Sequence, residues 1–300
     1  MLQIEPTGAI LGATVHGLDL REPLSDADFA AVLKALGTHG VLRIPGQQID
    51  ARQLRDFSRR FGSIQGSVTG KFHHKEVPEV GILSNIVENG EPIGIADAGQ
   101  DWHTDMSYTQ TKGFVNVLYA VKVPMRDGRP LGDTLFANTR AAYVDLPEEV
   151  KRRLAGMTAR HDFNKFWEKM RIRPVSRRDP LTPEQRAKRP PAFHPVFMTH
   201  PITGETVLYC NPGYAERIME LDEAESERML AYLFAHQLQE KYLWAHKWTV
   251  GDVLIWDHIG TLHNAIPDYG PHEERLMLRC QVMAETIFDE GFQRQWLRAA

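Results

Sequence analysis

The chain has 300 residues, of which 42% are hydrophobic and 25% are charged, and its formal net charge is −4. This is the composition of a globular protein with a large core, and without a basic run nothing suggests a nucleic acid or an anionic membrane as partner. No signal peptide, no apolar run near the length of a membrane span and only two cysteines, Cys210 and Cys280, predict a cytoplasmic protein without a disulfide framework.

The first 62 residues are predicted to contain short strands and two helices. Apolar residues alternate with turn residues within 1–20, and 41–45 is a further strand. The segment 25–28, Ser-Asp-Ala-Asp, is typical of a helix start, and apolar residues at helical spacing continue this helix up to 37–40. A second helix is predicted to end at Gly62.

The rest of the chain contains many short strands and a few helices, which favours one β-rich domain over residues 1–300. Two segments, 63–99 and 164–192, show no clear periodicity over most of their length. Loops of this length in compact domains are often functional lids, so we expect both to cover a substrate site. The further predicted strands are 80–85, 114–121, 132–137, 193–197, 206–210, 253–257 and 276–282, and the further predicted helices are 146–154 and 222–240.

His103 and Asp105 form a His-x-Asp pair directly after the first of these segments. In an extended strand, residues two apart lie on one face, so these two side chains would project together. A third ligand is available far downstream, where His263 follows Trp256-Asp257. Two histidines and one carboxylate with open coordination positions are typical of non-haem Fe(II) oxygenases.

Arg275 and Arg279 lie four residues apart in the strand that follows His263. An even spacing in a strand places both side chains on one face. A 2-oxo acid that binds iron through two atoms carries a second carboxylate, and arginine is suited to a planar clamp on such a group. The pattern therefore predicts an anion site close to the metal site.

With these motifs, the chain resembles the taurine dioxygenase / 2,4-dichlorophenoxyacetate dioxygenase family of Fe(II)- and 2-oxoglutarate-dependent oxygenases. The resemblance covers the chain almost from end to end. It implies a mainly β fold with flanking helices, a distorted double-stranded β-helix or jelly roll. The motifs that carry it are Trp102-His103-Thr104-Asp105, Gly132-Asp133-Thr134-Leu135, His194-Pro195-Val196, Trp256-Asp257 with His263, and Arg275 with Arg279.

The resemblance also implies roles for individual residues. His103, Asp105 and His263 would bind Fe(II), while Thr134 and Arg275 would bind the distal carboxylate of 2-oxoglutarate. A further arginine would contact the other carboxylate of 2-oxoglutarate or an anionic group of the substrate. The expected substrate contacts are Lys71, Met106, Phe163, Tyr209 and this second arginine, Arg279.

The implied reaction consumes 2-oxoglutarate and dioxygen, releases succinate and CO2, and hydroxylates a small organic substrate. With a small residue in place of Asp105, a halide could bind the iron. The presence of Asp105 therefore favours hydroxylation over halogenation. The expected substrate is anionic: an aryloxyalkanoate, an alkylsulfonate, an alkyl sulfate or an N-acyl amino acid. Taurine is not expected, because Ser67 and Gly70–Lys71 stand where taurine-cleaving members carry a histidine and a tyrosine, and Gly99 stands near a lost asparagine. The family often forms dimers or tetramers, so a homo-oligomer is a further expectation.

Two other classes of protein use similar residues. A zinc hydrolase could use the same three ligands, but it would need a general base and gives no role to Arg275. A non-catalytic barrel could bind an anionic metabolite, although mere binding needs no open metal positions. His258 is an alternative distal ligand, five residues before His263. We expect His73 and His74 to be ordinary loop residues, and His194 and His200 to be structural.

Overall fold

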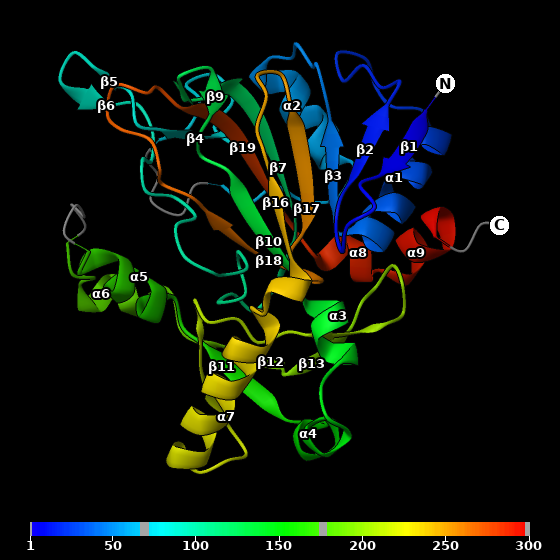
Figure 1. Ribbon diagram of the computed structural model, residues 1–300, viewed down its shortest axis with the longest axis vertical. Coiled ribbons are helices and arrows are strands. Elements are labelled where there is room, and N and C mark those ends of the chain that lie inside the picture. Colours follow the sequence, from blue (N-terminus) through cyan, green and yellow to red (C-terminus); the bar gives the residue numbers. More distant parts are fainter. Residues whose placement is uncertain (1, 67–71, 174–178, 298–300) are drawn as a thin grey trace.

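The largest element of the protein is a seven-stranded sheet (Figure 1). The computed structural model describes residues 2–66, 72–173 and 179–297. The pairs of neighbouring strands are antiparallel, except for one parallel pair, β2 with β3. In sheet order the strands are β1 (Gln3–Pro6), β2 (Ala13–His16), β3 (Val41–Ile44), β17 (Val253–Asp257), β7 (Gly113–Lys122), β19 (Leu276–Met283) and β4 (Gly81–Ser84).

A three-stranded antiparallel sheet packs on one face of the large sheet. Its strands are β16 (Leu243–His246), β10 (Thr134–Asn138) and β18 (Thr261–Ala265), in this order. Leu118, Leu254 and Trp256 of the large sheet and Phe136 of the small one belong to a single buried apolar cluster. The two sheets therefore enclose a core between them, and the metal-binding motifs lie at its edge.

Helices cover the opposite face of the large sheet. Val253 and Ile255 pack against them, whereas their neighbours Leu254 and Trp256 point to the small sheet. This alternation is the side-chain period of a strand that is buried on both faces. The covering helices are α1 (Asp26–His39), α2 (Ala51–Arg59), α8 (Glu285–Phe288) and α9 (Glu290–Trp296).

Most of the described residues between 139 and 242 build a further layer with its own apolar core (Figure 1). In this layer β11 lies between β12 and β15, and β13 pairs with β14. Two short hairpins, β5–β6 and β8–β9, project from the large sheet. The bounds of these elements are α3 (Thr139–Val144), α4 (Glu148–Leu154), β11 (Thr158–His161), α5 (Phe163–Arg171), α6 (Pro183–Ala187), β12 (Ala192–Pro195), β13 (Phe197–Thr199), β14 (Thr206–Leu208), β15 (Ala215–Ile218), α7 (Glu223–Gln237), the 3-10 helix η1 (Glu240–Tyr242), β5 (Val87–Glu88), β6 (Glu91–Pro92), β8 (Met125–Arg126) and β9 (Arg129–Pro130).

The predicted mainly β fold with flanking helices is confirmed, and so are the helices with clear capping residues. The Ser25 side chain accepts a hydrogen bond from the backbone N–H of Asp28 at the start of α1, and Gly40 ends this helix with φ of 69°. The segment 164–192, which has no clear period, contains most of α5 and all of α6. In the described part of the chain, no helix is both long and apolar enough to cross a membrane.

Candidate metal centre and active site

The His-x-Asp motif lies in a turn, and the strand predicted for it is wrong. Only His103 pairs, in an isolated antiparallel bridge with His263: the two residues exchange N–H···O bonds of 3.1 and 2.8 Å. The Thr104 hydroxyl lies 2.8 Å and 2.9 Å from the carbonyl oxygens of His258 and Thr261. Met106 then has φ of 61°, so the chain leaves the extended conformation directly after Asp105. Contacts with distant segments, rather than a ladder, place the two side chains together.

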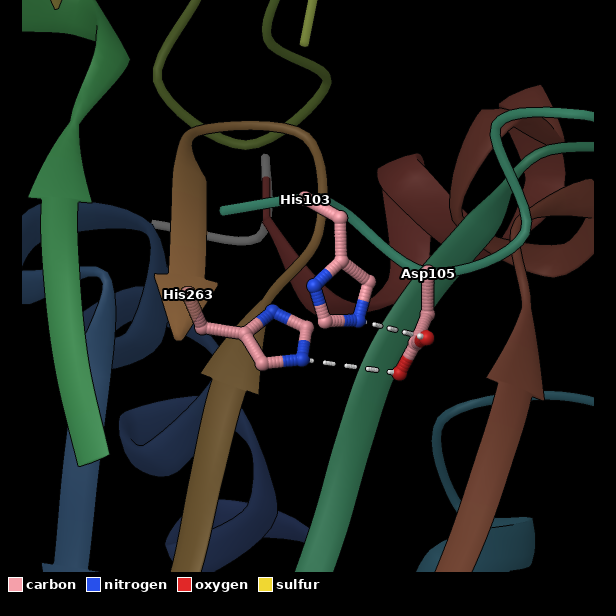
Figure 2. Close-up of side chains that lie close together, drawn as sticks. All are labelled: His103, Asp105 and His263. Carbon is pink, nitrogen blue, oxygen red and sulfur yellow. Dashed lines mark ion pairs between the residues drawn. The ribbon is translucent and has the colours of Figure 1, made fainter. Parts of the chain in front are cut away.

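His103, Asp105 and His263 converge into one buried cluster (Figure 2). One ligand atom from each lies within 4.8 Å of the others. His103 Nε2 is 3.3 Å from Asp105 Oδ1, and His263 Nε2 is 3.7 Å from Asp105 Oδ2. Two imidazole nitrogens and a carboxylate oxygen fit a divalent first-row metal such as Fe(II).

A backbone carbonyl fixes the orientation of the first histidine. His103 Nδ1 lies 2.7 Å from the carbonyl oxygen of Asp101, which can only accept, so Nδ1 carries the proton. This leaves Nε2, which faces Asp105 Oδ1 at 3.3 Å, as the nitrogen that can bind a metal. This is the second-sphere arrangement in which histidine ligands of metals usually occur.

The electrostatics of the cluster favour metal binding. Burial raises the pKa of the Asp105 carboxyl, but the hydrogen bond and charge of His103, together with His263 and Arg279, outweigh it and hold this pKa well below its usual value. Burial, reinforced by His103, holds the pKa of His263 well below its usual value. An ionised carboxylate and a neutral imidazole are the protonation states that a metal requires of these ligands.

Three further side chains approach the second oxygen of Asp105. The buried Asn116 donates from Nδ2 to Asp105 Oδ2 at 3.2 Å, and Arg279 Nη1 lies 4.0 Å from the same oxygen. His258 Nε2 also lies 4.0 Å away, and burial lowers the pKa of His258 to about 4. The structure nevertheless groups His263, and not His258, with the other two ligands.

Arg275 and Thr134 lie apart from the cavity described next. Arg275 precedes β19, and the strand shifts register directly after it, between Leu276 and Met277. Its guanidinium is buried, and among the described residues its Nε has no hydrogen-bond partner and no carboxylate lies within 4.0 Å of it. A buried cation of this kind fits an anionic ligand such as the distal carboxylate of 2-oxoglutarate. Thr134 accepts a hydrogen bond from Trp248 Nε1 at 3.1 Å, which leaves its own hydroxyl proton available.

A cavity of about 660 Å³ opens beside the triad. His103, Asp105 and Arg279 line it, together with residues of both long segments singled out in the sequence. The remaining charged residues of the lining are Asp97, Asp179, Lys188 and Arg189. Its aromatic lining residues are Phe72, Tyr108, Phe163, Phe166, Trp167 and Tyr214.

The expected substrate contacts fall in different places. Phe163 lines the cavity, as Arg279 does. Met106 and Tyr209 do not line it: Met106 is buried with its sulfur accepting a hydrogen bond from the Tyr108 hydroxyl, and Tyr209 is packed in the core. Met106 does not line the cavity because its positive φ turns its side chain away from the direction it would have in an extended strand. Lys71 lies outside the described residues, as do Ser67 and Gly70.

Several residues that shape the site carry no metal-binding chemistry of their own. The Phe166 and Tyr214 rings pack on the His103 ring, with centroids 5.0 and 6.1 Å away. A Cβ on Gly213 would lie 2.6 Å from the Cβ of His103, so this position has room only for glycine. The turn-forming triplet Asn-Pro-Gly at 211–213 is a sequence signal for this close approach, whereas Phe166 has none.

Comparisons with known proteins agree with this site. The family model described as "Taurine catabolism dioxygenase TauD, TfdA family" matches residues 3–281. Pentalenolactone F synthase of Streptomyces arenae is 34% identical in an alignment of 292 residues that covers 94% of each chain. The alpha-ketoglutarate-dependent 2,4-dichlorophenoxyacetate dioxygenase of Burkholderia sp. (strain RASC) is 31% identical in an alignment of 260 residues that covers 83% of this chain and 84% of that protein.

The fold agrees as well. The crystal structure of a taurine dioxygenase from Burkholderia xenovorans superposes with a TM-score of 0.75 at 26% sequence identity, and the match covers 94% of this chain and 89% of that one. The match of the family model along almost the whole chain and the buried His-Asp-His cluster lead to one conclusion. The protein belongs to the TauD/TfdA family and is a dioxygenase that depends on Fe(II), α-ketoglutarate (2-oxoglutarate) and dioxygen.

Proposed function

We propose that the protein hydroxylates a small carboxylic acid with an aromatic body, of the aryloxyalkanoate class. The observation that carries this proposal is the cavity, which is lined by Arg279, by the metal ligands His103 and Asp105 and by a group of aromatic rings. Such a lining matches a molecule with an anionic end and an aromatic body. The similarity to a 2,4-dichlorophenoxyacetate dioxygenase supports the same class.

His103, Asp105 and His263 hold the iron in this proposal, and Arg275 and Thr134 hold the distal carboxylate of 2-oxoglutarate. When bound, Fe(II), 2-oxoglutarate and dioxygen supply the oxidising power for hydroxylation, and succinate and CO2 are released. Arg279 neutralises an anionic group next to Asp105, on the substrate or on 2-oxoglutarate. Phe163 contacts the body of the substrate, whereas Met106 and Tyr209 act only through packing.

The two long segments act as covers of the substrate site in the same proposal. Ile95 and Gly99 of the segment 63–99 and Phe166 and Arg189 of the segment 164–192 line the cavity. We also propose that the two facing sheets are the layers of a distorted jelly roll within one domain. Facing sheets with a shared apolar core support this arrangement.

The test is succinate formation by the anaerobically Fe(II)-loaded protein with 2-oxoglutarate, oxygen and a panel of candidate substrates. The panel contains aryloxyalkanoates, alkylsulfonates, alkyl sulfates, N-acyl amino acids and taurine. Stimulation by aryloxyalkanoates, with one hydroxylated or cleaved product per succinate, is the expected result. Stimulation by another class alone would contradict the proposed substrate and leave the dioxygenase chemistry intact.

The two other classes of protein are not favoured, because the relatives named above include an α-ketoglutarate-dependent dioxygenase and the catalytic triad is complete. Replacement of the metal distinguishes a hydrolase directly. We expect no turnover with Zn(II) and turnover with Fe(II). A protein that binds 2-oxoglutarate but converts none with any metal would be the non-catalytic barrel instead.

A further inference from the structure

Asp101 connects both histidine ligands through its backbone. Its carbonyl oxygen accepts the 2.7 Å hydrogen bond from His103 Nδ1, and its N–H donates to Asn264 Oδ1 at 2.7 Å, next to His263. The residue has φ of 101°, a left-handed conformation that few side chains adopt. Strained backbone of this kind persists where surrounding contacts fix it, and it is common at functional sites.

The carboxylate of Asp101 points to a different element. Oδ1 accepts a hydrogen bond of 2.9 Å from the N–H of Trp102, and Oδ2 forms ion pairs with Lys169 of α5 and with Arg173, at 3.6 Å, just after it. Arg173 also donates to Gln100 Oε1 at 3.2 Å. The Asp101 side chain is 18% exposed, which makes these pairs less screened than pairs on the open surface. Asp101 thus joins α5 to the turn that carries His103 and Asp105, called the metal-binding turn below.

The helix α5 carries a large part of the cavity wall. Phe163, Phe166 and Trp167 all line the cavity, and Phe166 packs on the ring of His103. Its N-terminal half is also attached to the rest of the fold, because Lys165 donates to the carbonyl oxygen of Ala215. At its C-terminal end, α5 contacts the metal-binding turn through the ion pairs of Asp101 with Lys169 and with Arg173, which follows the helix. Arg173 adds its hydrogen bond to Gln100.

From this arrangement we infer that Asp101 is a positioning residue that holds α5 against the metal-binding turn. The rings of α5 that line the cavity then keep a fixed distance from His103. The inference rests on the proposed function in one respect, namely that α5 contacts the substrate. A wall that shifts by about 1 Å changes the distance between the substrate and the metal, and reactions of this kind are sensitive to such a shift. Loss of the ion pairs of Asp101 should therefore uncouple 2-oxoglutarate consumption from substrate oxidation.

The first experiment compares four variants with the wild type. Asp101→Asn keeps the backbone contacts and suits the left-handed conformation, but it removes both ion pairs. Lys169→Met removes one pair, and Lys169→Arg retains the charge. Arg171→Gln is the matched control, because Arg171 pairs only with Glu168 of the same helix among the described residues, at 2.7 Å.

We expect Asp101→Asn and Lys169→Met to raise the KM for the primary substrate about twofold to tenfold and to lower the product formed per succinate. Combining them should add little to the effect of Asp101→Asn alone, because both act on one contact. Lys169→Arg and Arg171→Gln should behave like the wild type. Unchanged KM and coupling in Asp101→Asn, or fully additive effects in the double variant, would overturn the inference.

A second experiment tests the attachment of α5 to the metal-binding turn without any substrate. Amide hydrogen exchange across 163–171 should be faster in Asp101→Asn and Lys169→Met than in the wild type and in Arg171→Gln. Equal exchange in all proteins would overturn the inference even if no substrate were known. Faster exchange with no stimulation by any compound of the panel would instead contradict only the proposed substrate class.

Discussion

The position of His103 depends on the absence of one side chain. Gly213 lies so close that an added Cβ would come within 2.6 Å of the histidine Cβ and 3.2 Å of the carbonyl oxygen of Trp102. The backbone of this turn is tied to other segments, so the histidine must move instead.

We therefore predict that Gly213→Ala weakens metal binding about tenfold to a hundredfold, the size of effect that a displaced ligand or a lost second-sphere partner produces. Titration with Mn(II), followed by electron paramagnetic resonance, measures this without turnover. Gly66→Ala is the control, because no atom lies within 4 Å of the Cβ it would introduce. Wild-type affinity in Gly213→Ala would show that the turn can relax.

The two arginines are predicted to act on different molecules. Arg275→Gln should raise the KM for 2-oxoglutarate about thirtyfold or more, since a buried carboxylate would lose its charged partner. Arg279→Gln should raise the KM for the primary substrate more than that for 2-oxoglutarate, because Arg279 lines the cavity and Arg275 does not. Initial rates with each compound varied in turn separate the two effects. The reverse pattern would exchange the roles of the two residues.

At the scale of elements, we predict that α5 determines which substrate body fits the cavity. Phe166 of this helix packs between the rings of His103 and Tyr214, with centroids 5.0 and 5.1 Å away. Replacement by leucine retains apolar volume but removes the aromatic contact. We predict that Phe166→Leu raises the KM for aryloxyalkanoates about threefold to tenfold and leaves the KM for 2-oxoglutarate within about twofold. Parallel assays with an aryloxy acid and an alkyl acid of similar length measure the change in preference, and equal losses for both would contradict it.

The elements also show what could be predicted from the sequence. α1 and α7 have capping residues and apolar periodicity, and their positions could be read from these local signals. α5 and α6 are short and lie in a charged, proline-bearing segment, so tertiary contacts decide their structure. The same applies to the His-x-Asp turn, where the two-residue spacing suits a strand but contacts with His258, Thr261 and His263 determine the backbone. The grouping of His103, Asp105 and His263 could be predicted because two histidines and a carboxylate form a chemically recognisable set. The positions of Met106 and Tyr209 outside the cavity could not be predicted, because side-chain direction at a turn or in a core is not encoded locally.

At the scale of the whole molecule, buried neutral histidines make stability depend on pH. Burial lowers the pKa of His161 to about 3 and that of His194 to about 4. Both pKa values lie below that of an unfolded histidine, about 6.5, so between these values the unfolded chain binds more protons than the folded one. The stability that they contribute is complete above pH 6.5 and is lost as the pH falls toward the folded pKa.

We predict that the free energy of unfolding falls by about 1.4 kcal/mol per pH unit for each of these histidines between about pH 6 and pH 4. Urea unfolding of the apo protein at several pH values measures the slope. The His161→Phe variant should show a smaller slope than the wild type, whatever its absolute stability. Identical slopes would show that His161 is protonated in the folded protein.

The bridge between His103 and His263 has a consequence for biosynthesis. The two histidines are separated by more than half of the chain, and strand β7, the longest of the large sheet, is flanked by β17 and β19, which both lie after residue 250. On the ribosome, a nascent chain that has passed the His-x-Asp turn has neither the second histidine nor the two neighbours of β7. All three ligands can hold iron only after His263 has been synthesised, so metal loading at this site must follow the synthesis of strand β18.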